Sequence, residues 1–241
     1  MITPKRCLLT LLAAACYYAH SMSLKDDVIR YYHERAPVYD ETAGFNDPVG
    51  EELRGPIKER YRELFRGRSV LEIACGTGYW TAVIGETAKS VLAIDINISL
   101  LEQAQARCGK VPHISFKIAD AYTLEGVEGD FDAAAGFWWW SHVPKGLLKT
   151  FLGALHRRLK PGALVMFIDR LPYEGFYRKK DRDGNTIEQR ILPDSRSFMI
   201  VKNFPDEQEI RSALAGIADD VRYVARADER NWEVVYRVRK S

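Results

Sequence analysis

The sequence predicts an α/β fold in which one doubly wound, mostly parallel sheet forms the core of a single domain. Short apolar runs of strand length alternate along the chain with segments whose apolar residues recur at helical spacing. A chain of 241 residues is long enough for one such domain with a sizeable core. We find no internal repeat, low-complexity segment or second domain.

The N-terminal part, residues 22–66, is expected to form a helical cap. Val28, Ile29, Tyr32 and Ala36 share one face of a helix over 25–39, and Pro37 ends or bends it. A second amphipathic helix is predicted over 50–66. Its inward residues are Leu53, Ile57, Tyr61, Leu64 and Phe65.

Residues 67–170 are expected to form the ligand-binding core, in which strands and helices alternate. The predicted strands are 69–74, 90–95, 113–118, 131–136 and 163–169, and the predicted helices are 79–88, 98–108 and 145–159. Strands separated by helices run parallel, and a ligand of such a sheet binds at the carboxyl ends of the strands.

Residues 171–204 are polar and rich in turns. Asp183-Gly184-Asn185 predicts a hairpin, and the runs 186–192 and 197–203 could pair as strands. We interpret this segment as an insertion over the active-site mouth; a passive surface hairpin is the alternative. In residues 205–241, helix 206–215 and strands 220–226 and 232–238, one of them antiparallel, complete a seven-stranded sheet.

The most informative stretch is the strand that runs into Gly76-Thr77-Gly78. Glycine permits a tight turn and a close approach of the main chain to a ligand, and the following helix directs unpaired N–H groups at it. A second apolar run ends in Asp95, where a carboxylate can accept hydrogen bonds from both hydroxyls of a ribose. The pattern predicts a nucleotide-like cofactor, although Thr81 stands where a dinucleotide fingerprint has its third glycine.

Residues 72–78, Glu72-Ile73-Ala74-Cys75-Gly76-Thr77-Gly78, resemble the first motif of the class I S-adenosylmethionine-dependent methyltransferases. Asp95 matches that family's ribose acid, Asp120 in 115–121 matches the acid that meets the adenine amino group, and 131–137 and 159–163 resemble the fourth-strand motif and the turn into strand five. Tyr32-His33 to Tyr39-Asp40 and the His142-Val143 pair are similar to the ubiquinone/menaquinone-type small-molecule enzymes.

The resemblance implies a Rossmann-like methyltransferase fold and S-adenosyl-L-methionine as the cofactor. The residues that it places at the cofactor are Glu72, Ala74, Gly76, Gly78, Asp95, Ile96, Asp120, Ala121, Phe137 and Tyr39.

Two residues are candidates for the chemistry at the methyl acceptor. His142 follows the fourth strand and could take a proton from a phenol or enol, or else bridge the loop structurally. Tyr32 could contact the methionine part or the acceptor, or pack in the core. Of Trp138, Trp139 and Trp140, at least one should face the ligand cleft, because successive strand residues point to opposite faces.

The predicted reaction is in-line transfer of a methyl group to an oxygen, nitrogen or carbon atom of a small molecule. A formal charge of +2 and the absence of an Asn/Asp-Pro-Pro-Tyr/Phe motif after strand four argue against nucleic-acid targets. A non-catalytic protein that binds the same cofactor remains an alternative. A nicotinamide-dependent oxidoreductase would need the missing third glycine and a Tyr-x-x-x-Lys or similar catalytic pair. The sequence does not define the oligomeric state.

Residues 1–21 have two interpretations. Lys5-Arg6, the apolar stretch 7–16 and Ala13-Ala14-Ala15-Cys16 resemble a bacterial export or lipoprotein signal, too short to span a bilayer. Alternatively, translation starts at Met22 and the protein is cytoplasmic. The spacing of the four cysteines suggests neither zinc nor a disulfide, so no metal is expected.

Overall fold

The structure is a computed structural model that describes residues 4–239, with side chains from Tyr18 onward. Its main sheet has seven strands in the order β3-β2-β1-β4-β5-β10-β9. These are β1 (Ser69–Ile73), β2 (Ser90–Asp95), β3 (Ile114–Ile118), β4 (Phe131–Phe137), β5 (Leu159–Arg170), β9 (Ala218–Arg226) and β10 (Asn231–Val238). Only β10 runs antiparallel to its neighbours, which confirms the predicted doubly wound, mostly parallel sheet.

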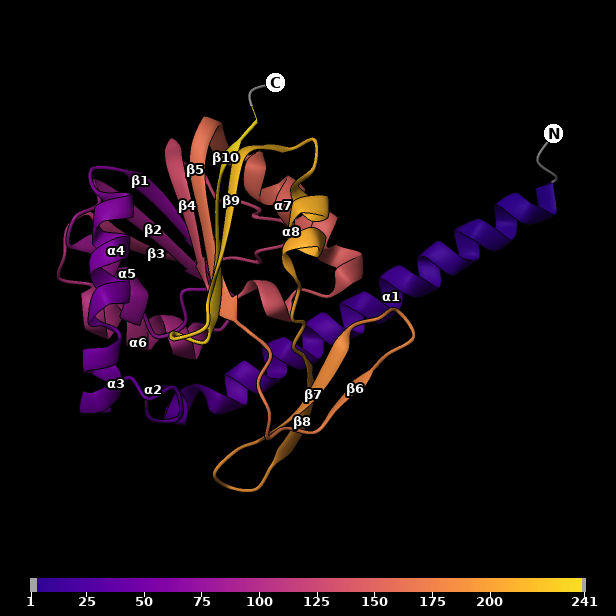
Figure 1. Cartoon of the computed structure of the whole chain (residues 1–241), viewed down its shortest axis with the longest axis horizontal. Helices are drawn as coiled ribbons and strands as arrows, with labels where there is room; N and C mark the ends of the chain where they lie inside the picture. The colour runs from indigo at the N-terminus through magenta and orange to yellow at the C-terminus, as the bar shows by residue number, and fades with distance from the viewer. Residues whose placement is uncertain (1–3, 240–241) are drawn as a thin grey trace.

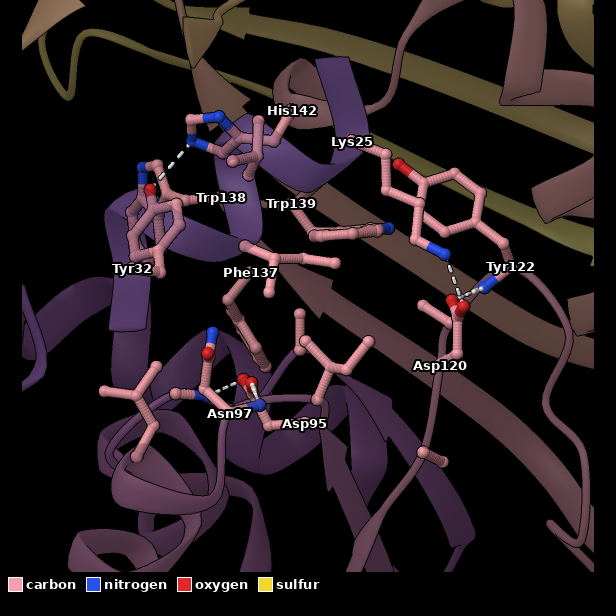
Figure 2. Close-up of a pocket in the computed structure, with 18 of the residues that line it drawn as sticks. Lys25, Tyr32, Asp95, Asn97, Asp120, Tyr122, Phe137, Trp138, Trp139 and His142 are labelled. Atoms are coloured by element: carbon pink, nitrogen blue, oxygen red, sulfur yellow. Dashed lines mark hydrogen bonds and ion pairs between the residues drawn. The ribbon is translucent and has the colours of Figure 1, made fainter. Parts of the chain in front are cut away.

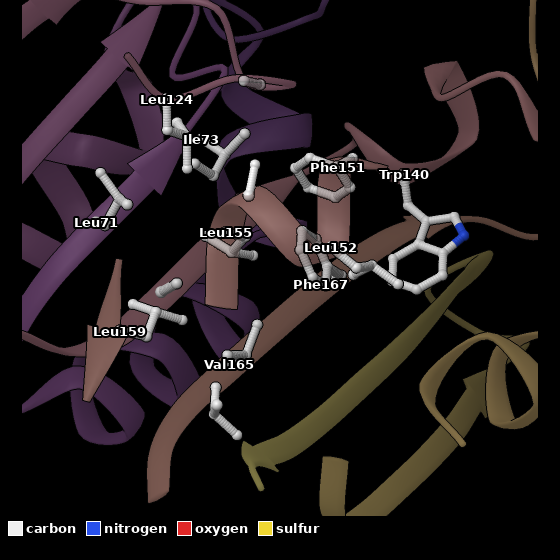
Figure 3. Close-up of a cluster of buried hydrophobic side chains, with 14 of the residues drawn as sticks. Leu71, Ile73, Leu124, Trp140, Phe151, Leu152, Leu155, Leu159, Val165 and Phe167 are labelled. Carbon is white, nitrogen blue, oxygen red and sulfur yellow. The ribbon is translucent and has the colours of Figure 1, made fainter. Parts of the chain in front are cut away.

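Helices cover both faces of this sheet (Figure 1). The helices α4 (Gly55–Phe65), α5 (Tyr79–Gly85) and α6 (Ile98–Cys108) pack on one face, and α7 (Leu148–His156) and α8 (Glu207–Leu214) on the other. Alternation along β5 sends Val165 and Phe167 towards α7 and sends Leu164 and Met166 towards α4 and α5. Figure 3 shows the larger cluster, in which Phe151 and Leu155 of α7 meet Phe167.

The helical cap differs from its prediction at two places. The first helix, α1, spans Pro4–Arg35 and therefore starts well before residue 25; it ends before Pro37, which lies in the 3-10 helix Ala36–Val38. The predicted helix 50–66 is two helices, α3 (Pro48–Leu53) and α4, because Pro56 lacks the N–H that a continuous helix needs. Leu53, predicted to face inward, is 72% exposed at the end of α3.

The segment after β5 forms a small antiparallel sheet of three strands, β6 (Arg178–Lys180), β7 (Thr186–Ile191) and β8 (Ser197–Val201). The hairpin predicted at 183–185 is present between β6 and β7. This sheet packs against α1 through Ile187, Ile200 and Val201, which meet Val28 and Tyr31. In Figure 1 the small sheet lies beside α1.

The boundary predicted between residues 21 and 22 falls inside α1, while residues 1–3 of the predicted leader lie outside the described part of the chain. None of the helices in the described residues has both the length and the apolar character required to cross a membrane.

The close contact of Gly78 with α6 leads to a prediction about the packing of α5 on α6. Its φ is +74°, and a Cβ there would lie 2.9 Å from the Cβ of Ala104. Gly78→Ala should lower the free energy of unfolding by about 2–4 kcal/mol, because backbone strain and overpacking add. Gly44→Ala is the control: φ is +69° with nothing within 4 Å, so about 1–2 kcal/mol of strain is expected. Urea unfolding that gives equal losses for the two variants would contradict the packing role.

Candidate active site

The strand order places a crevice at the carboxyl ends of β1 and β4. The chain proceeds outward from β1 to β2 and β3 and then crosses back to β4 on the other side of β1. Helices that leave adjacent strands towards opposite faces open a crevice at such a switch point, and ligands of doubly wound sheets bind there.

A cavity that is partly open to solvent lies at this point (Figure 2). Ten of the twelve residues proposed from the sequence line it. They are Tyr32, Tyr39, Ala74, Gly76, Asp95, Ile96, Asp120, Ala121, Phe137 and His142. The structure thus brings together residues from α1, from the segment after it and from the ends of β1, β2, β3 and β4.

Asp95 joins the turns that follow β1 and β2. Its Oδ2 accepts a hydrogen bond of 2.9 Å from the Gly76 main-chain N–H, and its Oδ1 accepts one of 2.9 Å from that of Asn97. Burial raises the pKa of Asp95, and these hydrogen bonds oppose the shift. Each carboxylate oxygen has a further lone pair, so the group can still accept hydrogen bonds from a ligand.

The main chain takes the left-handed conformation at Ala74, with φ 52°, and at Trp138, with φ 53°. These residues directly follow β1 and β4, and both line the cavity. A bulky residue with positive φ is uncommon and usually marks a functional constraint. Here the two turns direct the chain away from the crevice and leave space between the strand ends.

The change of direction at Trp138 separates the three tryptophans. Trp138 packs against Trp80 of α5, Trp139 against Phe151 of α7, and Trp140 is buried against Phe167. Trp138 and Trp139 line the cavity and Trp140 does not. The expectation that at least one tryptophan faces the cleft is confirmed. The indole N–H groups of Trp138 and Trp139 are buried and have no hydrogen-bond partner within the described residues.

Asp120 lies at the opposite side of the cavity from Tyr32, as Figure 2 shows. Its Oδ1 accepts a hydrogen bond of 2.9 Å from the main-chain N–H of Tyr122. Its Oδ2 accepts a hydrogen bond from the ammonium of Lys25, which belongs to α1. The sequence reasoning anticipated the carboxylate and missed the cation.

Tyr32 and His142 form a hydrogen-bonded pair at the end of the cavity near α1 (Figure 2). The His142 Nδ1–H donates to the main-chain oxygen of Val201 at 2.8 Å, because a carbonyl can only accept. The Nε2 of the neutral ring is then an acceptor, and the Tyr32 hydroxyl donates to it at 2.8 Å. Burial, and then the charge of Lys202, lowers the pKa of His142 well below its usual 6.5, while burial raises that of Tyr32.

A buried network behind His142 links its loop to β8. The Lys202 ammonium donates to Asp169 Oδ1 at 3.0 Å and to Ser141 Oγ at 2.6 Å. The other oxygen of Asp169 accepts from the Ser141 main-chain N–H at 2.9 Å. Asn203 adds a hydrogen bond of 2.7 Å from its own N–H to the Ser141 carbonyl. Residues 171–204 contribute no side chain to the cavity wall, yet they hold the loop that carries His142.

Tyr39 closes the cavity above the glycine turn. A Cβ placed on Gly76 would lie 3.6 Å from the Tyr39 hydroxyl. The short helix α2 (Tyr39–Thr42) is held there because Thr77 donates a hydrogen bond of 2.5 Å to Asp40, which also pairs with Arg107 of α6.

Two of the expected cofactor residues lie outside the cavity wall. Glu72 is 1% exposed within the sheet, and burial raises its pKa to about 8. Gly78 faces Ala104 of α6 and serves the packing of two helices. The wall contains residues that the sequence reasoning did not assign to the site, namely Lys25, Val28, Ile29, Asn97, Leu100, Ala119 and Tyr122. It also contains Trp138 and Trp139, two of the three tryptophans of which at least one was expected there. The helical spacing of 25, 28, 29 and 32 was the available signal for the members from α1.

One group of metal-ligating side chains lies outside the cavity in the part of the chain that the structure describes: His20, Asp181 and Asp183. Asp181 accepts hydrogen bonds from the N–H groups of Asp183 and Asn185 and from the Asn185 side chain, and it pairs with His20 at 3.0 Å. Its oxygens are therefore engaged, and the group joins α1 to the β6–β7 turn.

The fold and the cavity together define a Rossmann-like domain built to hold a nucleotide-type ligand at its switch point. Residues 70–162 match the family model described as a methyltransferase domain. Among solved structures, a DhpI–SAH complex is similar with a TM-score of 0.71 and 26% identity, covering 90% of this chain and 98% of that one. A DhpI–SAM–HEP complex gives a TM-score of 0.70 and 27% identity, covering 89% and 97%.

Curated relatives agree with these structures. Protein-L-isoaspartate O-methyltransferase 1 of Nitrosospira multiformis is 32% identical over 60% of this chain and 61% of its own length. Demethylmenaquinone methyltransferase of Staphylococcus epidermidis is 28% identical over 43% of this chain and 44% of its own length. The chain thus spans less than two thirds of the length of either relative. Residues 70–162 are therefore similar to methyltransferase domains, in agreement with the resemblance that the sequence motifs carry.

The buried Lys202–Asp169 pair leads to a prediction about stability. Lys202→Met should lower the free energy of unfolding by about 3–5 kcal/mol, because it leaves the carboxylate of Asp169 buried without its counterion. The double variant Lys202→Met/Asp169→Asn removes both charges and should recover part of that loss. Urea unfolding measures each value. Lys145→Met breaks the exposed pair with Glu209 and should cost about 0–1 kcal/mol. A loss for Lys202→Met no larger than for Lys145→Met would refute the role of the buried pair.

Proposed function

We propose that this protein transfers a methyl group from S-adenosylmethionine to a small-molecule acceptor. The observation that carries the proposal is the cavity itself, which joins a glycine turn and a ribose-type carboxylate to a neutral histidine whose Nε2 accepts a hydrogen bond from Tyr32. The family and the two complexes with SAM or SAH support the choice of cofactor.

The residues of the cavity fit that cofactor. Asp95 retains lone pairs for the ribose hydroxyls, and the main chain at Gly76 has no side chain that would prevent close approach. Phe137, Trp138 and Tyr39 present aromatic rings in the wall between this floor and His142. Aromatic faces attract cations, which suits a sulfonium.

His142 supplies the function of a general base. When bound, the cofactor supplies an activated methyl group whose transfer is an in-line displacement on carbon. An acceptor hydroxyl that replaces the Tyr32 hydroxyl at His142 Nε2 would give its proton to that nitrogen. The bond from Nδ1 to Val201 keeps Nε2 free of a proton beforehand. The raised pKa of Tyr32 keeps its hydroxyl protonated, so it serves as a hydrogen-bond donor rather than as the base.

A small acceptor fits the wall better than a protein segment does. Lys25, Val28, Ile29 and Tyr32 of α1 line the cavity, so α1 crosses the side on which the acceptor must lie. An acceptor with an acidic O–H group agrees with the position of His142. The name of one relative, protein-L-isoaspartate O-methyltransferase 1, describes a protein acceptor instead.

The direct test combines calorimetry with a methyl-release assay. Titration with S-adenosylhomocysteine should give a one-site isotherm, and a panel of phenols, enols and carboxylic acids should include acceptors that turn over. A peptide that contains isoaspartate represents the protein-type acceptor. Binding without turnover on any acceptor would favour a non-catalytic protein, and heat with a nicotinamide nucleotide alone would refute the cofactor.

The first prediction from this proposal concerns Asp95. Asp95→Ala should weaken binding of S-adenosylhomocysteine by about 1–3 kcal/mol, because the ribose hydroxyls lose their acceptor. Calorimetry provides the measurement. Asp130→Ala, which removes a carboxylate that is 86% exposed, should leave the affinity unchanged. Equal affinities for the Asp95 variant and the wild type would remove Asp95 from the cofactor site.

The second prediction concerns His142. His142→Ala should lower turnover at least about 100-fold if the ring is the base, with little change in the affinity for S-adenosylhomocysteine. Because the pKa of His142 lies below 6.5, wild-type turnover should not fall between pH 7.5 and pH 6.5. His156→Ala is the control, since His156 bonds to Tyr236 and does not line the cavity. A twofold effect of His142→Ala would make the residue structural.

A further inference from the structure

Lys25 lines the cavity, but the reaction outlined above gives it no role. The residue is 8% exposed, and its ammonium lies 5.0 Å from the centre of the Tyr122 ring. Figure 2 shows the ammonium directed at Asp120, on the side of the cavity away from Tyr32 and His142. Lys25 is the one lysine or arginine among the described residues that line this cavity.

The hydrogen-bonding capacity of Lys25 is only partly used. An ammonium has three N–H donors, and the described residues provide one hydrogen-bond acceptor, the Oδ2 of Asp120. The remaining donors belong to a nearly buried group in the cavity wall. A ligand that displaces water from this side without offering an acceptor would leave them unpaired, at a cost in binding free energy.

Asp120 depends on Lys25 once a ligand covers it. The Asp120 side chain is 26% exposed, and a ligand that fills the cavity would remove that contact with water. A carboxylate without water needs a counterion, and Lys25 already supplies it. Both oxygens accept a hydrogen bond from the protein, yet each keeps a lone pair for a ligand donor.

The resemblance already implies that Asp120 accepts a hydrogen bond from the adenine amino group. We propose that Lys25 adds a second contact, in which its ammonium donates a hydrogen bond to a ring nitrogen beside that amino group. The side-by-side acceptor and donor match the edge of adenine, where an amino donor is flanked by nitrogen acceptors. The inference rests on the proposed cofactor and assigns to α1 a part in selecting its base.

The same arrangement selects against hypoxanthine. An oxygen at position 6 cannot donate to Asp120, and it would place two acceptors against each other. The pair should therefore discriminate between adenosine and inosine forms of one ligand, with Asp120 as the discriminating group. If Lys25 contacts N7, it should contribute to the affinity in both forms, because N7 is an acceptor in each; if it contacts N1, its contribution should be lost with the inosine form, where N1 carries a hydrogen.

The experiment is calorimetric titration with S-adenosylhomocysteine. Lys25→Met should bind it about 10- to 100-fold more weakly than the wild type, the loss expected for a hydrogen bond that involves a charged group. Lys160→Met is the matched control, because it breaks the surface pair with Asp130 at the start of β5 and should bind normally. Affinity of Lys25→Met equal to or higher than that of the wild type would overturn the proposal and would mean that Lys25 merely occupies the base site.

Two ligand analogues locate the hydrogen bond. S-Adenosylhomocysteine in which CH replaces the ring nitrogen N1, or N7, should bind the wild type more weakly for one of the two positions. That difference should disappear in Lys25→Met. If both analogues lose the same affinity in the variant as in the wild type, Lys25 does not contact the ring. Should Lys25→Met fail to fold by circular dichroism, Lys25→Leu, which also removes every side-chain donor, supports the same comparison.

Failure of this inference can be told apart from failure of the proposed function. If wild-type protein gives no heat with S-adenosylhomocysteine, the cofactor assignment is wrong and there is no adenine ring for Lys25 to contact. If the wild type binds and Asp95→Ala weakens binding while Lys25→Met does not, the cofactor stands and only the role of Lys25 is refuted.

Discussion

The carboxylate of Asp95 is the interaction on which the cavity depends. Its two oxygens engage main-chain N–H groups from two different turns, at Gly76 and at Asn97. Parallel pairing of β1 with β2 sets Ile73 opposite Ile94, so the turn after β1 begins where Asp95 ends β2. Without a carboxylate there, two buried N–H groups would lack partners and the turns would lose their common anchor. The residue proposed to bind the ribose therefore also has a structural role.

A second constraint on the site comes from the small sheet β6–β8, whose strands lie far from β4 in the sequence. His142 follows β4, but the atom that fixes its tautomer is the carbonyl of Val201, 59 residues later. The ammonium of the adjacent Lys202 donates hydrogen bonds to Asp169 and to Ser141, which lies in the same loop as His142. These contacts are buried, so the small sheet positions His142 although it does not line the cavity. They favour a role for residues 171–204 in supporting the site over a passive surface hairpin.

Elements whose signals are local could be predicted closely. Strand 90–95 and helix 98–108 agree with β2 and α6 at both ends, because apolar runs and helical spacing are encoded within a few residues. The division of 50–66 into two helices was missed, although Gly55-Pro56 offered a signal for it. The three-residue strand β6 was missed because it is short and polar, and it forms only where β7 provides a partner.

In the cavity wall, too, the sequence predicted the single residues that have a local signal and missed those that do not. The motifs located Gly76, Asp95 and Asp120, because a turn or strand end fixes where such residues lie relative to their own strand. They could not separate Gly78, which packs against Ala104, from Gly76, since both glycines have positive φ and differ only in what lies opposite. Lys25 shares the helical spacing of 28, 29 and 32, but its role could not be predicted, for a related reason. Its partner is 95 positions away, and a lysine on a helix acquires a specific role only when the path of α1 across the sheet brings it to a carboxylate. Motifs therefore define the floor of this site, whereas the elements packed over it determine what the floor can bind.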